Sequence, residues 1–409
     1  MTGRVVIVGA GACGGTVAVM LRTIGFEGSL TLVGDEALAP YERPPLSKAA
    51  LTGDDAPPPS TIHHEDRLAE LGVDFVGGAP AVAIDRVARE VELKGGRRVG
   101  YDRLVLATGA RPRPLPVPGG DSALMLRTVA DAHALRDALA PGTRVGIIGG
   151  GFIGLEVAAS AVSRGCDVTV VELAPSVMGR VVPRELAGAM AARHGAAGVR
   201  LRCGVGVDRI EAAGDRWRVV LDDGASVACD VVLAGVGALP NTDLAQAAGL
   251  AIDNGIATDA TLATSDPTIF AAGDCCSFPH PLYGGQRLRL EAWRNALDQA
   301  EAVAHNVLGA VEPYARVPWF WTDQYELSLY MAGLPQAASR EVLRERTDGV
   351  VLRLGLDDSG RLVSASALAE GTVAVKDLRL AERLIAARAH PERGELADPG
   401  ISLKGLLSA

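Results

Sequence analysis

Two stretches of the chain repeat one pattern of apolar and polar positions. Residues 4–33 (RVVIVGAGACGGTVAVMLRTIGFEGSLTLV) and residues 144–172 (RVGIIGGGFIGLEVAASAVSRGCDVTVVE) each begin with a short apolar run, pass through a glycine-rich turn, continue at helical spacing, and end in a run of β-branched residues. Short apolar runs bounded by turns predict buried strands, and the helical spacing predicts a helix. Both stretches therefore predict a strand, a tight turn, a helix and a second strand.

The turn of the first stretch has the glycine spacing of a dinucleotide-binding fold. Its three motif glycines are Gly9, Gly11 and Gly14. They permit the tight turn, the close approach of a pyrophosphate, and the packing of helix on strand, respectively. The acid that usually follows by about 20 residues is displaced here, because Gly34 stands at its position. We assign the contact with the ribose to Asp35, with Glu36 as the alternative.

The second stretch carries the same motif in its regular form. Its glycines are Gly149, Gly151 and Gly154. Glu172 closes the second strand 21 residues after Gly151. An acid at this position hydrogen-bonds the adenosine ribose of NADH and repels the additional phosphate of NADPH. Because no arginine follows before Arg180, the sequence favours NADH.

Length and charge restrict the class of protein. A chain of 409 residues with 48% hydrophobic residues and a mean hydropathy of +0.20 is expected to form two or three globular domains. A net charge of −9 argues against nucleic acid as a partner, since phosphate binding needs a basic face. The longest apolar run, residues 145–162, contains Glu156 and five glycines, so we expect no membrane span. The amino end has no basic and apolar leader, which favours the cytoplasm.

The six cysteines show neither a C-x-x-C redox pair nor a paired metal-binding spacing. We expect free, mostly buried thiols in a reducing compartment. The seven histidines show no metal-ligand spacing either, so no metal site is expected.

Two complete dinucleotide folds in one chain imply that a flavin dinucleotide meets a nicotinamide dinucleotide. In two-dinucleotide flavoproteins, a strand ending like Ala107-Thr108-Gly109 marks the exit from the flavin domain, and one ending like Gly273-Asp274 marks the return and supplies an acid to the ribityl chain. These signals bracket the second glycine motif. We therefore expect an FAD domain at 1–112 and 242–317, an NADH domain at 113–241, and a C-terminal domain at 318–409.

The chain resembles the FAD-dependent ferredoxin reductases of the oxygenase-coupled type, the family of putidaredoxin reductase and biphenyl dioxygenase ferredoxin reductase. The motifs that carry the resemblance follow in family order: GAGACGG, YERPPLSK, LVLATG, IGGGFIGLEVAA, ELAPSVMGRV, TSDPTIFAAGDC, EAWRNALDQA and PWFWTDQYE. The resemblance implies an α/β, glutathione reductase-like fold with two dinucleotide-binding (Rossmann-type) domains and a C-terminal α+β domain. Its cofactors would be FAD and NADH.

The resemblance also implies roles for single residues. In YERPPLSK, residues 41–48, the prolines would begin a helix beside the flavin ring, with Lys48 near the ring and paired to Glu156. Trp321 would lie beside the flavin on the path of electron exit. The remaining cofactor contacts are expected at Arg43, Thr108, Gly109, Gly237, Asp274 and Trp293, with Glu291 and Asn295 close by.

The segment around Lys48 also excludes neighbouring enzyme classes. Disulfide reductases of this fold carry a cysteine pair facing the flavin, and the oxidase and peroxidase group carries one cysteine near Ser47 and Lys48. This chain has neither, so electrons would leave the flavin directly. A one-electron acceptor fits: a small acidic iron-sulfur ferredoxin, [2Fe-2S] by family expectation, that feeds an oxygenase. The cluster must lie on the partner, because the chain lacks iron-sulfur cysteine spacing.

Three alternatives stay open at this point: an NADH oxidase or peroxidase, a rubredoxin reductase, and a redox-sensing protein related to apoptosis-inducing factor. We expect a monomer or weak dimer.

Overall fold

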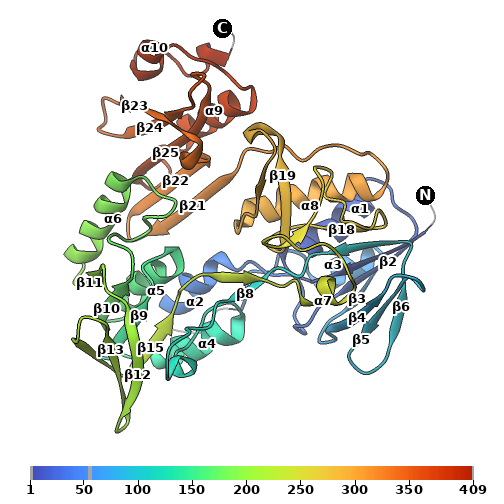
Figure 1. The fold of residues 1–409 in the computed structure, drawn as a ribbon, viewed down its shortest axis with the longest axis horizontal. Helices are drawn as coiled ribbons and strands as arrows, with labels where there is room; N and C mark the ends of the chain where they lie inside the picture. The colour runs from blue at the N-terminus through green and yellow to red at the C-terminus, as the bar shows by residue number, and fades with distance from the viewer. Residues whose placement is uncertain (1–2, 54–57, 408–409) are drawn as a thin grey trace. The chain divides into compact units, whose positions relative to one another are not determined.

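The computed structural model describes residues 3–53 and 58–407. The chain divides into two compact units (Figure 1). Unit 1 is made of Met1–Arg43, Pro59–Arg111 and Leu239–Arg316, and unit 2 of Pro44–Pro58, Pro112–Ala238 and Val317–Ala409. Each unit contains one of the two glycine motifs.

Unit 1 is built on a five-stranded parallel sheet of order β18-β7-β1-β2-β3. Its strands are β1 (Arg4–Val8), β2 (Ser29–Val33), β3 (Val73–Val76), β7 (Arg103–Leu106) and β18 (Ile269–Ala271). Helix α1 (Ala12–Thr23) follows β1 and packs against α8 (Trp293–Val307). After the exposed arginine that begins each of them, the central strands β1 and β7 are apolar and buried, as is typical of a parallel sheet that is covered on both faces.

Smaller elements complete unit 1. The strands β4 (Ala81–Asp85), β5 (Glu90–Leu93) and β6 (Arg98–Gly100) form an antiparallel sheet. A second small sheet contains β17 (Ile256–Ala257), β19 (Cys276–His280) and β20 (Gln286–Leu288). The short helices are α3 (Glu65–Glu70) and α7 (Asp243–Ala247), and β8 (Ala110–Pro112) and β16 (Ala238–Pro240) lie where the chain leaves unit 1 and returns.

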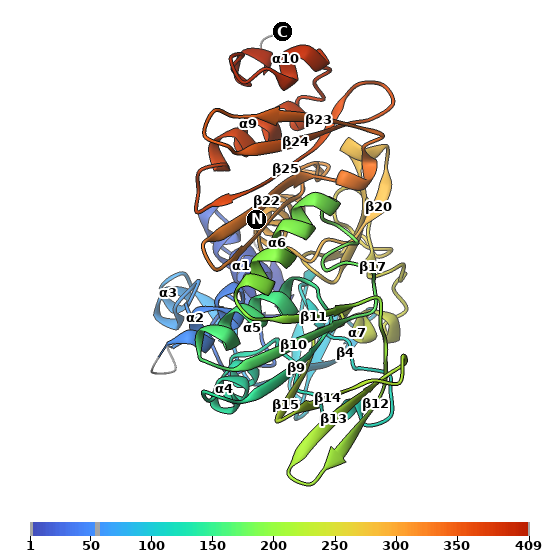
Figure 2. The same ribbon diagram turned by 90° about the vertical axis from the view of Figure 1, so that its left-hand side faces the viewer.

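Unit 2 contains a second parallel sheet of order β11-β10-β9-β15 (Figure 2). Its strands are β9 (Arg144–Ile148), β10 (Asp167–Glu172), β11 (Arg200–Cys203) and β15 (Val231–Ala234). The helices around it are α4 (Val129–Ala138), α5 (Phe152–Ser163) and α6 (Arg184–Ala196). An antiparallel sheet of β12 (Val207–Ala213), β13 (Arg216–Leu221) and β14 (Ser226–Cys229) follows.

The last part of unit 2 is an antiparallel sheet of order β21-β22-β25-β24-β23. Its strands are β21 (Trp319–Gln324), β22 (Leu327–Gly333), β23 (Arg340–Glu345), β24 (Val351–Leu356) and β25 (Leu362–Glu370). Helix α9 (Val375–Ala386) packs on β22 and β25, and α10 (Arg393–Ala397) packs on β23 (Figure 1). The predicted combination of two dinucleotide-binding folds and a C-terminal α+β part is confirmed.

One apolar cluster joins the second dinucleotide fold to the C-terminal sheet. Leu155 of α5 and Met190 of α6 belong to the same buried cluster as Leu329 and Met331 of β22. Burial of apolar surface between them removes it from water, at roughly 25 cal/mol per Å². The cluster therefore joins residues that the sequence assigned to two domains, and the three-domain division stays a prediction.

The segment that contains YERPPLSK differs from the predicted helix. Pro44–Ser47 forms a 3₁₀ turn, and a helix of four residues, α2 (Ala49–Thr52), follows Lys48. The backbone of Lys48 is not helical, with φ −123° and ψ −103°. The prolines thus begin a 3₁₀ turn, and the short α-helix starts only after Lys48. Among the described helices, none is long and apolar enough to cross a bilayer.

We predict that Arg344 is required for the stability of the C-terminal part. Its guanidinium is buried and donates to the carbonyl oxygens of Leu396, Asp398, Pro399 and Ile401. Arg344→Met should lower the free energy of unfolding by roughly 2 to 4 kcal/mol, because these carbonyls lose their charged donor. Thermal unfolding followed by circular dichroism measures the loss. Arg340→Met, at the exposed start of the same strand, is the matched control, and equal stability of the two variants would contradict the prediction.

Candidate cofactor-binding site

The turn between β1 and α1 needs glycine at specific positions. Gly9 has φ +111°, and a Cβ there would lie 2.1 Å from the carbonyl oxygen of Ala107. At Gly14, a Cβ would lie 1.8 Å from the carbonyl oxygen of Gly9. A side chain at either position would therefore break the contact of the turn with β7 or with α1.

The same arrangement recurs between β9 and α5. Gly149 has φ +105°, and a Cβ at Gly154 would lie 2.1 Å from the carbonyl oxygen of Gly149. The two turns are thus built alike in units 1 and 2, although the residues between the glycines differ.

Both turns fit a dinucleotide pyrophosphate. Gly11 and Gly151 are the N-cap residues of α1 and α5, and neither helix has a side-chain cap. A Cβ on either glycine would meet no atom within 4 Å, so the space in front of the helix amino end is open. Uncapped N–H groups at the positive end of a helix are suited to bind phosphate.

The acid of the second fold is held by the glycine turn itself. One carboxylate oxygen of Glu172 accepts from the backbone N–H of Gly150 at 2.6 Å, and the other accepts from Ala174 at 2.7 Å. A Cβ on Gly150 would come within 3.1 Å of the Glu172 Cβ. The absence of a side chain at Gly150 therefore makes room for Glu172.

The first fold reverses this arrangement. Strand registers of Val8 with Val33 and of Ile148 with Val171 place Gly34 where the second fold has Glu172. A Cβ on Gly34 would lie 2.8 Å from the Cβ of Ala10. Because Ala10 fills the space, no side chain fits at the usual acidic position.

The two acids that follow Gly34 have different hydrogen-bond partners. Glu36 accepts from the Tyr41 hydroxyl at 2.7 Å and from the Arg43 guanidinium at 2.9 Å. Asp35 accepts from the backbone N–H of Glu36 at 3.0 Å. The ion pair with Glu36 thus holds Arg43 beside the first glycine fold. The choice between Asp35 and Glu36 as the partner of the ribose stays a prediction.

Residues 44–53 are anchored along one face of α5. Lys48 Nζ lies 2.7 Å from Glu156 Oε1, and the Ser47 hydroxyl donates to Glu156 Oε2. One turn on, the Ser160 hydroxyl donates to the Ser47 carbonyl at 2.7 Å, and a further turn on, Arg164 donates to the Leu51 carbonyl at 2.9 Å. Positions spaced by four residues lie on one helix face, so α5 holds the segment at three successive turns.

The two bracketing signals lie beside the first glycine turn. Thr108 donates to the Asn241 carbonyl at 2.7 Å, and Asn241 donates back to the Thr108 carbonyl at 2.8 Å. Gly273 comes within contact of Cys13, since a Cβ there would lie 3.2 Å from the Cys13 Cβ. Strands β7 and β18, which lead into these signals, are neighbours in one sheet. Asn241 was missed by the sequence reasoning, because nothing local marks its pairing with Thr108.

The other predicted contacts occupy ends and turns of elements. Gly109 and Gly237 have φ of +68° and +105°. Trp293 begins α8, and Trp321 lies in the middle of β21. Asp274 follows β18 in the same turn as Gly273, and its carbonyl accepts from Arg289 at 3.4 Å.

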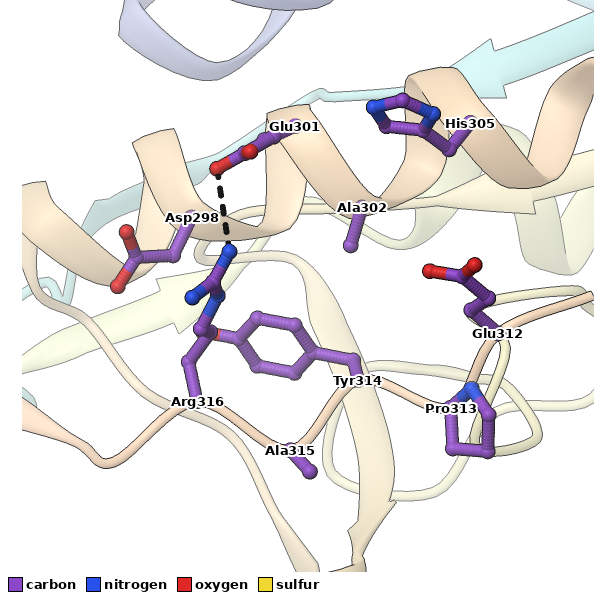
Figure 3. A pocket seen from close by; sticks show the side chains of 9 residues that line it. All are labelled: Asp298, Glu301, Ala302, His305, Glu312, Pro313, Tyr314, Ala315 and Arg316. Atoms are coloured by element: carbon purple, nitrogen blue, oxygen red, sulfur yellow. Dashed lines mark ion pairs between the residues drawn. The ribbon is translucent and has the colours of Figure 1, made fainter. Parts of the chain in front are cut away.

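A cavity of about 320 Å³ lies apart from all of these residues (Figure 3). It is formed by the carboxyl half of α8 and the segment 312–316, with Glu301 paired to Arg316 at 3.5 Å. None of the predicted site residues lines it. Within residues 3–53 and 58–407 no group of His, Cys, Asp and Glu side chains could hold a metal ion.

All six cysteines lie in the described part of the chain and are free, and only Cys203 is exposed. Burial raises the pKa of the Cys229 thiol to about 11 and also raises the pKa of Cys203. A thiol with a raised pKa is a poor nucleophile at neutral pH. The structure thus shows no thiol partner at Ser47 or Lys48.

Comparison with known proteins decides the family. Residues 3–300 match the pyridine nucleotide-disulphide oxidoreductases, and residues 319–407 match the reductase C-terminal family. The chain belongs to the pyridine nucleotide-disulphide oxidoreductase family. It is an oxidoreductase that uses FAD and NADH, as predicted.

Relatives cover the whole chain. It is 42% identical to the ferredoxin–NAD(+) reductase component of the anthranilate 1,2-dioxygenase system of Burkholderia cepacia, over 98% of both chains. The ferredoxin reductase for the CYP199A2 system of Rhodopseudomonas palustris has a TM-score of 0.92 and 38% identity, covering 98% of this chain and 99% of that one. The reductase in the covalent putidaredoxin reductase–putidaredoxin complex has a TM-score of 0.92 and 37% identity, covering 99% and 98%.

We predict that Glu172 sets the preference for NADH. Glu172→Ala should lower the ratio of kcat/KM for NADH over NADPH by about tenfold or more, because a like charge beside the NADPH phosphate is costly. Steady-state kinetics with both nucleotides measures the ratio. Asp167→Asn removes the same charge at the other end of β10 and should leave the ratio unchanged, whereas a lower KM for NADPH in the unmodified protein would overturn the assignment.

We also predict that one thiol reacts in the folded protein. Ellman's reagent at pH 7.5 should release one equivalent from native protein, through Cys203, and six from denatured protein. Because the pKa of Cys203 is raised, its thiolate fraction and its reaction rate should still increase above pH 9. Cys203→Ser should abolish the native reaction, and a second fast thiol would contradict the burial of the other five.

Proposed function

We propose that the chain is an NADH-dependent ferredoxin reductase. It passes electrons from NADH through FAD to a small acidic ferredoxin, of the [2Fe-2S] type, which supplies a cytochrome monooxygenase or ring-hydroxylating dioxygenase. The proposal is supported by relatives that are named as ferredoxin–NAD(+) reductase components of dioxygenase systems. It is also supported by the similarity to a reductase that forms a covalent complex with putidaredoxin.

One observation carries the proposal: residues 44–53 hold an ion pair to α5 and contain no cysteine. Lys48 and Glu156 are 2.7 Å apart, and Ser47, not a cysteine, precedes the lysine. Bound FAD accepts a hydride from NADH and releases electrons one at a time. Without a cysteine in this segment to relay them, the electrons pass directly to the acceptor protein.

The proposed role of Lys48 is electrostatic. A fixed ammonium beside the ring favours the negative charge that hydride arrival brings, and it costs little reorganisation because Glu156 already orients it. Trp321 is proposed to exclude water beside the flavin and to lie on the path of electron exit. No proton transfer is required of either residue, so alignment and charge are their contribution.

The other site residues are proposed to position the two cofactors. Those assigned to FAD are Gly9, Gly11, Gly14, Asp35, Arg43, Thr108, Gly109, Asp274 and Trp293, and those assigned to NADH are Gly149, Gly151, Gly154, Glu172 and Gly237. The FAD domain would comprise 1–112 and 242–317, the NADH domain 113–241, and the C-terminal domain 318–409.

An acidic ferredoxin requires a local basic surface on a chain with net charge −9. Electrostatic steering depends on a local patch and not on the total charge, so arginines on the docking face suffice. The protein is proposed to work in the cytoplasm as a monomer or weak dimer. Six free cysteines support a reducing compartment.

The competing functions on this fold are an NADH oxidase or peroxidase and a rubredoxin reductase. The missing cysteine near Ser47 and Lys48 argues against the oxidase, and the relatives of dioxygenase systems favour ferredoxin over rubredoxin.

The test is reduction of cytochrome c by NADH and the purified protein, with and without a [2Fe-2S] ferredoxin from an oxygenase system. Cytochrome c reduction should accelerate at least about tenfold with ferredoxin, because ferredoxin would dock on the reductase and carry single electrons to cytochrome c, which has no matching docking surface of its own. A rubredoxin in place of ferredoxin is the control partner. Rapid oxygen consumption with NADH alone, unchanged by ferredoxin, would establish the oxidase instead.

A further inference from the structure

A line of buried polar side chains leads from Lys48 through the interior of unit 2. The Thr322 hydroxyl donates to Glu156 Oε1 at 2.5 Å, and Gln324 Nε2 donates to Thr322 Oγ1 at 3.1 Å. His194 Nε2 lies 2.8 Å from Gln324 Oε1, and the Tyr325 hydroxyl lies 3.1 Å from His194 Nδ1. Thr322 and His194 have no exposed surface, and Gln324 is 2% exposed.

The line has one consistent direction of donation. Glu156 pairs with Lys48 and so acts only as an acceptor. The Thr322 hydroxyl must then donate to it, which leaves Thr322 Oγ1 to accept from the Gln324 amide. The Gln324 oxygen in turn needs the N–H of His194 Nε2, so Nδ1 of His194 is left to accept from the tyrosine. Burial lowers the pKa of His194, in agreement with this neutral ring.

The far end of the line is kept under backbone strain. Gln324 pairs with Leu327, so Tyr325 and Glu326 form a two-residue turn between β21 and β22. Tyr325 has φ +58°, a left-handed conformation that is unfavourable for a bulky residue and that favours glycine or asparagine. The Arg193 guanidinium lies 4.1 Å from the tyrosine ring centroid, and it pairs with Glu326 at 2.6 Å. A tyrosine at this turn is explained by its hydroxyl, which reaches His194.

Strand β21 brings the line and Trp321 together. Side chains alternate along a strand, so Phe320, Thr322 and Gln324 share one face, and Trp321 belongs to the other. Phe320 packs on Phe152 of α5 with ring centroids 4.1 Å apart, one helical turn before Glu156. The same strand therefore carries the proposed electron exit and the hydroxyl that holds Glu156.

We propose that Thr322, oriented by Gln324, His194 and Tyr325, is a positioning residue for the Glu156–Lys48 pair. This inference rests on the proposed placement of Lys48 beside the flavin. Ser47, Lys48 and Thr322 donate to one carboxylate, so without the threonine donor it is held by two donors and is less neutralised. The surroundings of the ring then become more negative, and the bound flavin becomes harder to reduce.

The test compares Thr322→Val, which keeps the shape and loses the hydroxyl, with Thr322→Ser, which keeps the hydroxyl. Anaerobic stopped-flow mixing with NADH measures flavin reduction, and redox titration measures the midpoint potential, both per bound FAD. Thr322→Val should slow reduction by about tenfold and lower the potential, because a buried hydrogen bond to a charged group is lost. Thr322→Ser should behave like the unmodified protein. Thr169→Val, at a buried threonine of β10, is the matched control.

The far end is tested by a double-mutant cycle. Tyr325→Phe keeps the ring and should slow reduction about two- to threefold, since its effect is transmitted through two side chains. If Tyr325 acts through Thr322, the double variant should be no slower than Thr322→Val alone. Tyr325→Phe leaves the core intact, so it keeps the proposal falsifiable if Thr322→Val does not fold.

Lys48→Met separates this inference from the proposed function. If Lys48→Met leaves both the reduction rate and the potential unchanged, the flavin-side role of Lys48 fails and this inference fails with it. If Lys48→Met slows reduction but Thr322→Val does not, or if Thr322→Ser is as slow as Thr322→Val, the positioning role of Thr322 is wrong while the reductase function stands.

Discussion

Charge compensation of one buried carboxylate organises unit 2. Glu156 is 5% exposed and would be costly as an unpaired anion. Lys48, Ser47 and Thr322 meet that requirement from two segments far apart in the chain. Residues 44–53 and strand β21 are consequently both tied to α5, the helix that begins at the second glycine turn. Because the charge of Glu156 needs these partners, α5 holds both Lys48, which is proposed to lie beside the flavin, and β21, which carries Trp321 on the proposed path of electron exit.

Residues 44–53 follow unit 1 in the sequence but belong to unit 2 in the structure. They follow directly on Arg43, which pairs with Glu36 in unit 1, yet their hydrogen bonds go to α4 and α5. Arg136 donates to the Gly53 carbonyl at 2.8 Å, in addition to the bonds from Ser160 and Arg164. The position of Lys48 therefore depends on the second dinucleotide fold, although in the sequence Lys48 follows residues of the first.

The sequence predicts the parts of this structure that depend on local spacing. Both glycine turns and Glu172 at its strand end follow from patterns within about 30 residues. The displaced acid of the first fold was also visible, but its cause was not: Ala10 and Gly34 meet across two strands. No local sequence pattern marks Thr322, Gln324 and His194, because their hydrogen bonds depend on how β21 and α6 pack on α5. The 3₁₀ turn at Pro44–Ser47 likewise departs from the helix that the resemblance suggested.

The apolar cluster shared by α5, α6 and β22 limits how such a reductase can diversify. A C-terminal sheet whose inner face completes the core of its neighbour cannot be exchanged as an independent cassette, since a foreign sheet would leave Leu155 and Met190 poorly packed. Consecutive residues of β22, from Ser328 to Gly333, are all buried, because α9 packs on the strand as well as the cluster. Both faces of this strand are therefore committed to packing, and a substitution at any of these positions has to keep the shape of the side chain that it replaces.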